Sequence, residues 1–149
     1  MTPSEILRSA AAAGVKPDLA QLIAAIPYAC YLGITVDRKG TEVTTVLKFQ
    51  PHLVGNVGLQ ALHGGVVGGF LETTAMMQVI FEVGAAEMPK PVDINIDYLR
   101  SGRAVDTYGR AVITKQGRRV VNVHAEAWQE EHDRPIAALH GHFLLPAEK

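Results

Sequence analysis

Hydrophobic and polar residues alternate along much of the chain, and this period of two indicates β-strands with one buried face. The first alternating run starts at Leu32, and a second covers residues 43–49 after a turn at 38–40. After Pro91 the alternation resumes and predicts four more strands, at residues 92–99, 105–115, 118–130 and 135–145. Turns at Gln116–Gly117 and His132–Asp133 are expected to join the last three strands as hairpins.

Other segments predict helices. Residues 4–13 and 17–26 form two short helices within an N-terminal extension of residues 1–31, with Ser4 capping the first and Pro17 opening the second. Residues 63–83 form one long helix that is apolar nearly all round, so other elements must wrap it. Its first seven residues include four glycines, each of which costs roughly 1 kcal/mol relative to alanine, so we expect close backbone approach there. Residues 51–62 are expected to form an irregular loop.

The order of these elements predicts the architecture. Short helices, two strands, one apolar helix and four strands are best packed by a single antiparallel sheet that curves around the long helix, which is an α+β arrangement. This is the layout of the hot-dog fold. A chain of 149 residues has the length of one domain, so we take residues 1–149 as a single domain.

Composition excludes several function classes. Hydrophobic residues make up 48% of the chain and charged residues 19%, with a formal net charge of −1, so the basic face of a nucleic-acid-binding protein is not expected. The single cysteine, Cys30, cannot form an internal disulfide and fits a reducing compartment. The first residues do not resemble a secretory signal, and Glu72 and Gln78 interrupt the apolar stretch 66–81. We therefore expect a soluble, cytoplasmic protein with no membrane partner.

The start of the long helix carries candidate chemistry. His63 is followed by Gly64 and Gly65, whose backbone N–H groups have no acceptor within the helix. These groups lie at the positive end of the helix dipole, and glycine allows a ligand to approach closely. Such a terminus can stabilise the oxyanion that develops at a carbonyl. A plain helix start with flexible glycines is the alternative interpretation.

Glu72 is the other candidate on this helix. Its neighbours one turn away are glycine, alanine and methionine, so the helix offers its carboxylate no basic partner. A carboxylate on a wrapped, apolar helix is partly desolvated, which suits acid–base chemistry. The alternative is a glutamate that reaches solvent through a gap in the wrapping.

The segments LHGGVVGGFLETTA and DINIDYLRSG, at residues 62–75 and 93–102, resemble the acyl-CoA thioesterases of the hot-dog superfamily, particularly the phenylacetate-degradation type. The similarity runs from about Leu32 to Leu145. It implies hydrolysis of an acyl-CoA to a free acid and CoA, without a cofactor. It also implies that the N–H of Gly64 polarises the thioester carbonyl and that Glu72 is the general base or the nucleophile. His63, with Gly65 beside it, then orients the loop.

Other family positions are matched less closely. Family members often carry Asn or Gln six residues before the histidine; this position is Val57 here, and Asn56 and Gln60 are the nearby candidates. Arg100 stands where some members have a serine that positions water. The remaining substrate-binding candidates are Thr73, next to Glu72, and three basic residues that suit the phosphates of CoA, Arg100, Arg118 and Arg119. Solvated basic residues at strand edges are the alternative.

The acyl group and a metal site are two further questions. Four side chains are candidates to line an aryl or a medium-chain acyl pocket: Phe70, Met76, Met77 and Tyr98. His124, His140 and His142 share one face of neighbouring strands and have the chemistry of zinc ligands. Because the other face of these strands carries the apolar residues, the histidines point away from the helix, and we expect no metal. That outward face is instead a candidate subunit contact.

The spacing of Gly64 and Glu72 predicts an oligomer. Eight residues separate them, which is about 12 Å along one helix and roughly 80° around it. An oxyanion donor and an attacking group must both lie within about 3–3.5 Å of one carbonyl. Two antiparallel copies of the helix would bring Gly64 of one chain beside Glu72 of the other. We therefore expect a homodimer with shared active sites, or a tetramer of two such dimers, as the family resemblance also implies.

Two other functions share this fold. A hydratase or dehydratase uses a histidine with an acidic residue, but the histidine near this helix lies within His-Gly-Gly, which fits a thioesterase better. A non-catalytic acyl-CoA-binding regulator would need a DNA-binding helix pair, and residues 1–31 are too few and too weakly charged for one.

Overall fold

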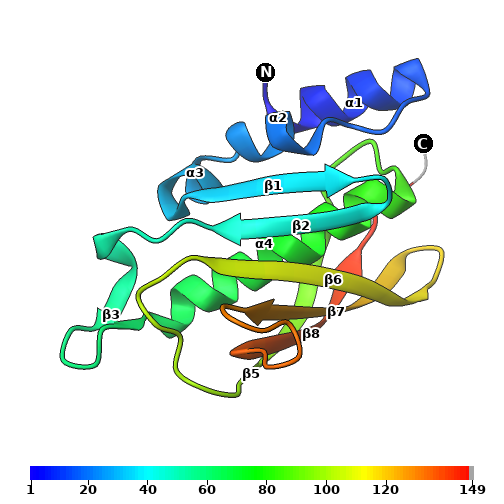
Figure 1. Cartoon of the computed structure of the whole chain (residues 1–149). Helices are drawn as coiled ribbons and strands as arrows, with labels where there is room; N and C mark the ends of the chain where they lie inside the picture. Colours follow the sequence, from blue (N-terminus) through cyan, green and yellow to red (C-terminus); the bar gives the residue numbers. More distant parts are fainter. Residues whose placement is uncertain (148–149) are drawn as a thin grey trace.

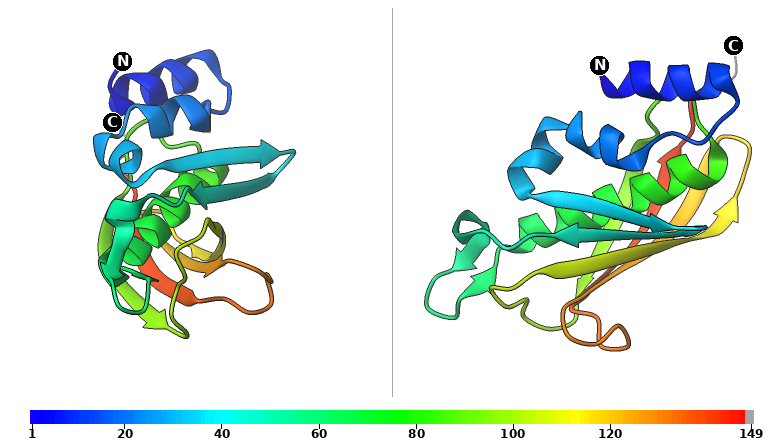
Figure 2. Two further views of the ribbon diagram at one scale, coloured as in Figure 1. Left: turned by 60° about the vertical axis from the view of Figure 1, so that its left-hand side comes forward. Right: turned by 45° about the horizontal axis from the view of Figure 1, so that its top comes forward.

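A computed structural model of the protein describes residues 1–147. In this part of the chain, six strands form one antiparallel sheet in the order β1-β2-β6-β7-β8-β5 (Figure 1). The strands are β1 (Ile34–Lys39), β2 (Glu42–Leu47), β5 (Lys90–Tyr98), β6 (Thr107–Gln116), β7 (Val120–Trp128) and β8 (Ala137–Leu144). The sheet curves around α4 (Gly64–Val83), as Figure 2 shows. The expected hot-dog fold is therefore confirmed.

The core lies between α4 and the concave face of the sheet. Apolar side chains of β7 and β8 that point inward are almost wholly buried, among them Val121, Leu139 and Phe143. Phe70 and Met77 of α4 are fully buried against them. These two side chains are core residues, so of the four acyl-pocket candidates only Met76 and Tyr98 remain accessible.

One buried polar contact fixes α4 to the sheet. The hydroxyl oxygens of Thr45 on β2 and Thr74 on α4 lie 2.6 Å apart, and Thr74 also donates to the Phe70 carbonyl at 2.8 Å. Gly109 on β6 makes room for this pair, because a Cβ there would lie 2.7 Å and 2.8 Å from the two hydroxyl oxygens. This contact therefore fixes the rotation of α4 about its own axis relative to the sheet.

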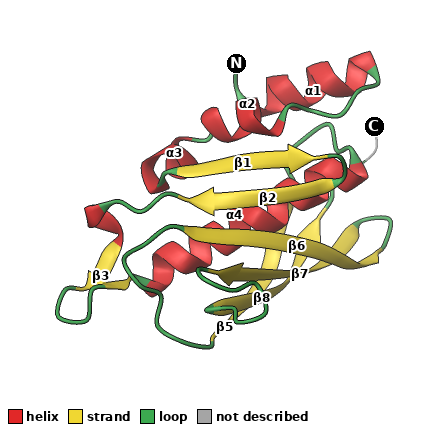
Figure 3. Cartoon of the chain, viewed as in Figure 1, coloured by secondary structure: helices red, strands yellow, loops and turns green. Residues whose placement is uncertain are grey.

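The N-terminal extension contains three helices, α1 (Pro3–Ala13), α2 (Leu19–Ala24) and α3 (Pro27–Leu32), rather than two (Figure 3). The expected cap Ser4 is wrong, because Thr2 caps α1 in a reciprocal pair with Glu5. The second helix begins at Leu19 after the capping residue Asp18, and not at Pro17 as expected. The first strand also begins two residues later than expected, because Pro27 starts α3 and the αL residue Gly33 ends it.

The extension packs on β1 and reaches the end of α4. Helices α2 and α3 both contact β1, and α3 also contacts α4. Lys16, between α1 and α2, donates to the carbonyl of Phe81 in the last turn of α4, where a cation is favoured by the helix dipole. The outer edge of β1 is thus covered.

The segment 51–62 is more regular than expected. A short 3₁₀ turn (Pro51–Leu53) precedes a two-stranded antiparallel pair, β3 (Val54–Asn56) with β4 (Ala61–Leu62). The close pairing is possible because Gly55 has no side chain; a Cβ there would lie 2.6 Å from the Cα of His63. This pair of strands leads directly into the start of α4.

By length and composition alone α4 could span a membrane, although the stretch 66–81 was expected to fall short of one. Most of the helix is buried inside the protein, as in a core helix.

The other end of the sheet order has an open edge, because within residues 1–147 β5 pairs with β8 alone. Its outer edge carries exposed Val92 and Tyr98. An unpaired edge of nine residues is a template for another strand.

The tight fit at Gly109 makes a stability prediction. Gly109→Ala should lower the free energy of unfolding by about 1–3 kcal/mol, because the methyl group overpacks the contact between Thr45 and Thr74. Gly58→Ala is the matched control, since its Cβ would meet only one atom, at 3.5 Å, and should change the value by less than about 0.5 kcal/mol. Denaturant titration of both variants measures the difference; equal stabilities would contradict the packing described here.

Candidate active site

The first turn of α4 presents one unoccupied backbone donor. His63 caps the helix, and its Nδ1 accepts a hydrogen bond from the N–H of Gly65 at 2.9 Å. The N–H of Gly65, which was expected to have no acceptor within the helix, is thus satisfied by the side chain of the capping residue. Within residues 1–147, the N–H of Gly64 has no hydrogen-bond partner, and Gly64 is exposed. Gly64 is thus the group at this terminus that can donate to a ligand.

A cavity of about 370 Å³ adjoins Gly64. Its walls come from α4, from the end of β5 and from the loop after β5, and they include Val67, Tyr98, Arg100 and Ser101. The guanidinium of Arg100 donates from Nη1 to the carbonyl of Pro135 at 2.6 Å. The structure therefore brings Arg100 to the same cavity as Gly64, with the hydroxyl of Ser101 next to it in the chain.

Tyr98 makes a contact that the sequence did not reveal. Its hydroxyl donates to the carbonyl oxygen of Gly64 at 2.8 Å, although the two residues are 34 positions apart. The ring lies against α4, 3.4 Å from the position that a Cβ of Gly64 would occupy. No local signal predicts this bond, because it depends on the register of β5 against β8.

Glu72 is half-buried on the side of α4 that faces away from the sheet. It lies two residues before Thr74, about 200° around the helix, and Thr74 bonds to the sheet. Within the described residues, its carboxylate has neither a hydrogen bond nor an ion pair. Glu72 does not line the cavity beside Gly64. One chain alone therefore does not bring these two candidates together.

The glycines around Glu72 allow aromatic and apolar side chains to lie directly on the helix. A Cβ on Gly68 would be 2.9 Å from Cδ1 of Ile96 in β5, and one on Gly69 would be 3.3 Å from Cε1 of Tyr28 in α3. The expected close approach is thus confirmed, although by side chains rather than by backbone. Tyr28 is 56% exposed and lies against Gly69, which is one helical turn before Glu72.

The remaining substrate-binding candidates are engaged locally. Asn56 accepts from the N–H of Leu59 at 3.0 Å, and Gln60 donates to the carbonyl of Val57 at 2.8 Å, both within the turn between β3 and β4. Thr73 donates back to the carbonyl of Gly69 at 2.8 Å. Asn56 and Gln60 are exposed, so their side chains shape the turn that leads to His63.

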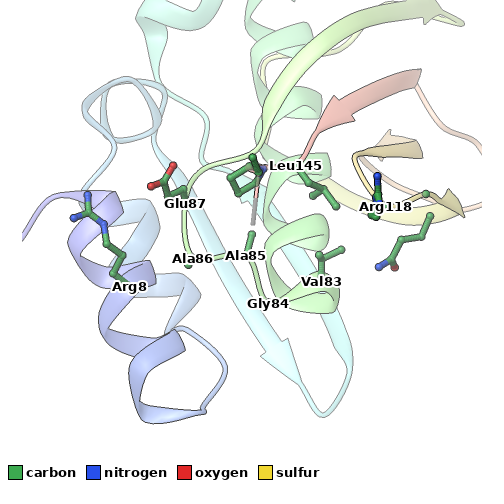
Figure 4. Close-up of a pocket in the computed structure, with 12 residues that line it drawn as sticks. Arg8, Val83, Gly84, Ala85, Ala86, Glu87, Arg118 and Leu145 are labelled. Carbon is green, nitrogen blue, oxygen red and sulfur yellow. The ribbon is translucent and has the colours of Figure 1, made fainter. Parts of the chain in front are cut away.

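Arg118 and Arg119 lie at the opposite end of α4 from Gly64. The helix has 20 residues and is about 30 Å long. Arg118 lines a cavity of about 630 Å³ at the C-terminal end of α4, and Figure 4 shows it across this cavity from Arg8 of α1. Arg119 donates to the carbonyl of Leu145. Within one chain, the structure separates these arginines from Gly64 and Arg100.

The histidines on the outward face of the sheet form pairs instead of a ligand set. His124 contacts Glu126 at 3.0 Å and lies 3.4 Å from His140, while His142 contacts Asp93 at 2.6 Å. Among the described residues, no group of three or more side chains is arranged to hold a metal ion. The pair of His124 with His140 links β7 to β8, and the pair of His142 with Asp93 links β8 to β5, on the face opposite the helix.

Comparison with known proteins gives a consistent picture. The family model of the thioesterase superfamily matches residues 59–136. A medium/long-chain acyl-CoA thioesterase of Escherichia coli, YigI, is 26% identical over 120 residues, which cover 71% of this chain and 77% of that protein. A crystal structure from Chromobacterium violaceum is 35% identical over the full length of both chains, with a TM-score of 0.73. A phenylacetic acid degradation-related protein from Ralstonia eutropha, 20% identical over 80% of this chain and 89% of its own, shares the fold with a TM-score of 0.70.

Proposed function

The chain belongs to the thioesterase superfamily and is a thioester hydrolase, and on that premise we propose that it hydrolyses acyl-CoA thioesters with Gly64 and Glu72 as the reacting groups. The observation that carries the proposal is the N–H of Gly64 at the start of α4, which has no partner within the described residues and lies beside a cavity. A carbonyl oxygen bound there would meet a backbone donor and the positive end of a helix dipole. These two features favour the charge that develops on oxygen when a thioester is attacked.

Glu72 supplies the attacking group in either of two ways. As a general base, its carboxylate takes a proton from water while the water oxygen bonds to the thioester carbon. The carbonyl then re-forms, the C–S bond breaks, and CoA leaves as a thiolate that takes up a proton. As a nucleophile, the carboxylate attacks directly, CoA leaves, and water hydrolyses the resulting mixed anhydride. Both routes give the same acid and the same thiol.

The geometry of His63 disfavours the hydratase alternative. Because Nδ1 accepts the N–H of Gly65, the neutral ring carries its proton on Nε2. That nitrogen is then a donor and cannot abstract a proton from substrate. A thioesterase needs no base at this position.

We propose that the active site is shared between two copies of the chain. Three observations support this. Gly64 and Glu72 are about 12 Å apart along α4. Within residues 1–147, Glu72 has no hydrogen-bond or ion-pair partner, and the outer edge of β5 is unpaired. A two-fold axis beside α4 and β5 would pair the two β5 edges and place each Glu72 near the other chain's Gly64. A tetramer would pair two such dimers.

The same symmetry suggests where CoA lies. With two antiparallel α4 helices, the C-terminal end of one lies toward the Gly64 end of the other. The cavity at that end has room for a nucleotide and is lined by the guanidinium-bearing residues Arg8 and Arg118, which form no ion pair within residues 1–147. We assign Arg118 and Arg119 to the CoA phosphates. The acyl group would lie on the exposed face of α4 beside Met76 and Tyr28. Because the Escherichia coli relative is a medium/long-chain acyl-CoA thioesterase, we propose medium or long acyl chains as the substrates.

A panel of alkyl- and aryl-CoAs, assayed for release of free thiol, tests the function directly. We expect hydrolysis of at least one class, and Glu72→Gln should lower kcat by about 10²–10⁴-fold because the amide neither accepts a proton nor attacks. Glu82→Gln on the same helix is the matched control and should keep wild-type turnover. Circular dichroism must show both variants folded. Wild-type turnover in folded Glu72→Gln would remove Glu72 from the mechanism.

A second prediction concerns the phosphates. Replacing Arg118 and Arg119 together with alanine should raise KM for acyl-CoA about tenfold or more, since charge-assisted hydrogen bonds to the phosphates are lost. The same acyl group on N-acetylcysteamine lacks the nucleotide and serves as the internal control. Equal changes in KM for both substrates would show that these arginines do not contact the nucleotide.

Subunit complementation tests the shared site. Gly64→Pro removes the donor N–H, and the backbone of His63 (φ −63°, ψ 132°) already suits a following proline. This variant, mixed with Glu72→Ala under conditions that exchange subunits, forms heterodimers with one intact site and one doubly altered site. Activity should reappear from two inactive parents. If mass spectrometry confirms exchange between folded parents and no activity returns, the two groups do not come from different chains.

A further inference from the structure

We propose that Tyr98 is a positioning residue for the oxyanion donor: it holds the first turn of α4 so that the Gly64 N–H is preoriented toward the thioester. The proposal rests on the proposed function, because it assigns Tyr98 a role in the same reaction. It concerns a side chain that acts through Gly64 and not on the substrate itself.

The peptide unit between Gly64 and Gly65 is held at both ends. Its carbonyl oxygen accepts from the Tyr98 hydroxyl at 2.8 Å, and its N–H donates to Nδ1 of His63 at 2.9 Å. Because a peptide unit is planar, two hydrogen bonds on opposite sides fix the orientation of the whole plane. One of these bonds is local to the helix cap, whereas the other comes from the distant strand β5.

The peptide unit before Gly64 is held on one side only. The carbonyl of His63 accepts from the N–H groups of Val66 and Val67 at 3.0 Å and 3.2 Å. The N–H on the other side of that unit belongs to Gly64 and is free within the described residues. The direction of this N–H therefore depends on the backbone angles of Gly64, which lie between the two held peptide units.

The hydrogen bond from Tyr98 is needed because the helix starts with two glycines. Gly64 and Gly65 are the first two residues of the helix, and glycine has more backbone freedom than any other residue. A donor that must stabilise a transition state is most effective when it is already oriented, so that no reorganisation is needed during the reaction. Tyr98 and His63 together remove the freedom that two consecutive glycines introduce.

The support for Tyr98 is itself rigid. Tyr98 is the last residue of β5 and pairs with Ala137 of β8. Directly after it, the N–H groups of Leu99 and Arg100 both donate to the carbonyl of Ile136, at 2.8 Å and 3.2 Å. The Tyr98 ring also covers the helix at Gly64 and Gly68, with its hydroxyl 3.4 Å and 3.7 Å from the Cβ positions those glycines leave empty. The hydroxyl is thus placed by the sheet.

Tyr98 is also 57% exposed and lines the cavity beside Gly64, so a direct contact with substrate is the competing role. The two roles differ in kinetics. A substrate contact that is equal in the ground state and the transition state changes KM, whereas loss of donor orientation lowers kcat and leaves KM nearly constant.

Tyr98→Phe is the test, because it removes the hydroxyl and keeps the ring. We expect kcat for the best acyl-CoA to fall about fivefold to tenfold, the effect of one hydrogen bond, with KM changed by less than about twofold. Hydrogen–deuterium exchange should be faster in the peptide that spans residues 62–67 and unchanged in β7 and β8. Tyr108→Phe is the matched control: its ring stacks on Trp128 on the outward face of the sheet, and it should leave kcat and exchange unchanged.

The outcomes separate the two proposals. A wild-type protein that hydrolyses no acyl-CoA contradicts the proposed function and the role of Tyr98 with it. An active wild type with unchanged kcat in Tyr98→Phe contradicts only the role of Tyr98. A rise in KM at constant kcat would make Tyr98 a substrate contact and would likewise overturn the positioning role.

Discussion

Burial of α4 inside the curved sheet is the constraint on which the rest of the structure depends. The helix is apolar nearly all round, and the contact between Thr45 and Thr74 sets its rotation against the sheet. With the rotation fixed, the first turn lies beside the end of β5, where Tyr98 reaches Gly64. The same rotation turns Glu72 away from the sheet, because it lies about 200° around the helix from Thr74. The placement of both proposed reacting groups thus follows from how one helix is packed.

Much of this fold is readable from the sequence because its two periodicities are strong. Alternation predicted all six strands of the main sheet, and the long, mostly apolar segment at 63–83 predicted α4 to within a residue. The short elements, α3 and the pair of β3 with β4, were missed because local backbone geometry, and not hydrophobic periodicity, determines them. Pro27 and Gly33 bracket α3, yet the apolar residues between them do not distinguish one helical turn from the start of a strand. The pairing of β3 with β4 depends on the absence of a side chain at Gly55, and the pattern of alternating hydrophobic residues does not reveal such a requirement.

The candidate site is predictable to a different extent. The motif identified Gly64 and Glu72, and their spacing alone shows that one helix does not unite them. The His63 side chain decides which glycine N–H can donate to a ligand, because its Nδ1 accepts the hydrogen bond from the Gly65 N–H. The basic residues at strand ends were grouped wrongly. Arg100 follows β5 and Arg118 follows β6, and because these two strands run in opposite directions, the arginines lie at opposite ends of the sheet. The Tyr98 bond needed the register of two strands and had no local signal.

The glycines of α4 have one more consequence, which concerns how related sequences can vary. Tyr98 fills the space that a side chain at Gly64 would take, Ile96 does so at Gly68, and Tyr28 at Gly69. Each pair shares one volume between a helix position and a residue of β5 or α3, so a larger side chain on one member requires a smaller one on the other. Such positions should change together during evolution, and single exchanges on either side should be rare. Across related sequences, the residues of each pair are therefore expected to covary. The pair of Gly64 and Tyr98 is constrained further by its hydrogen bond.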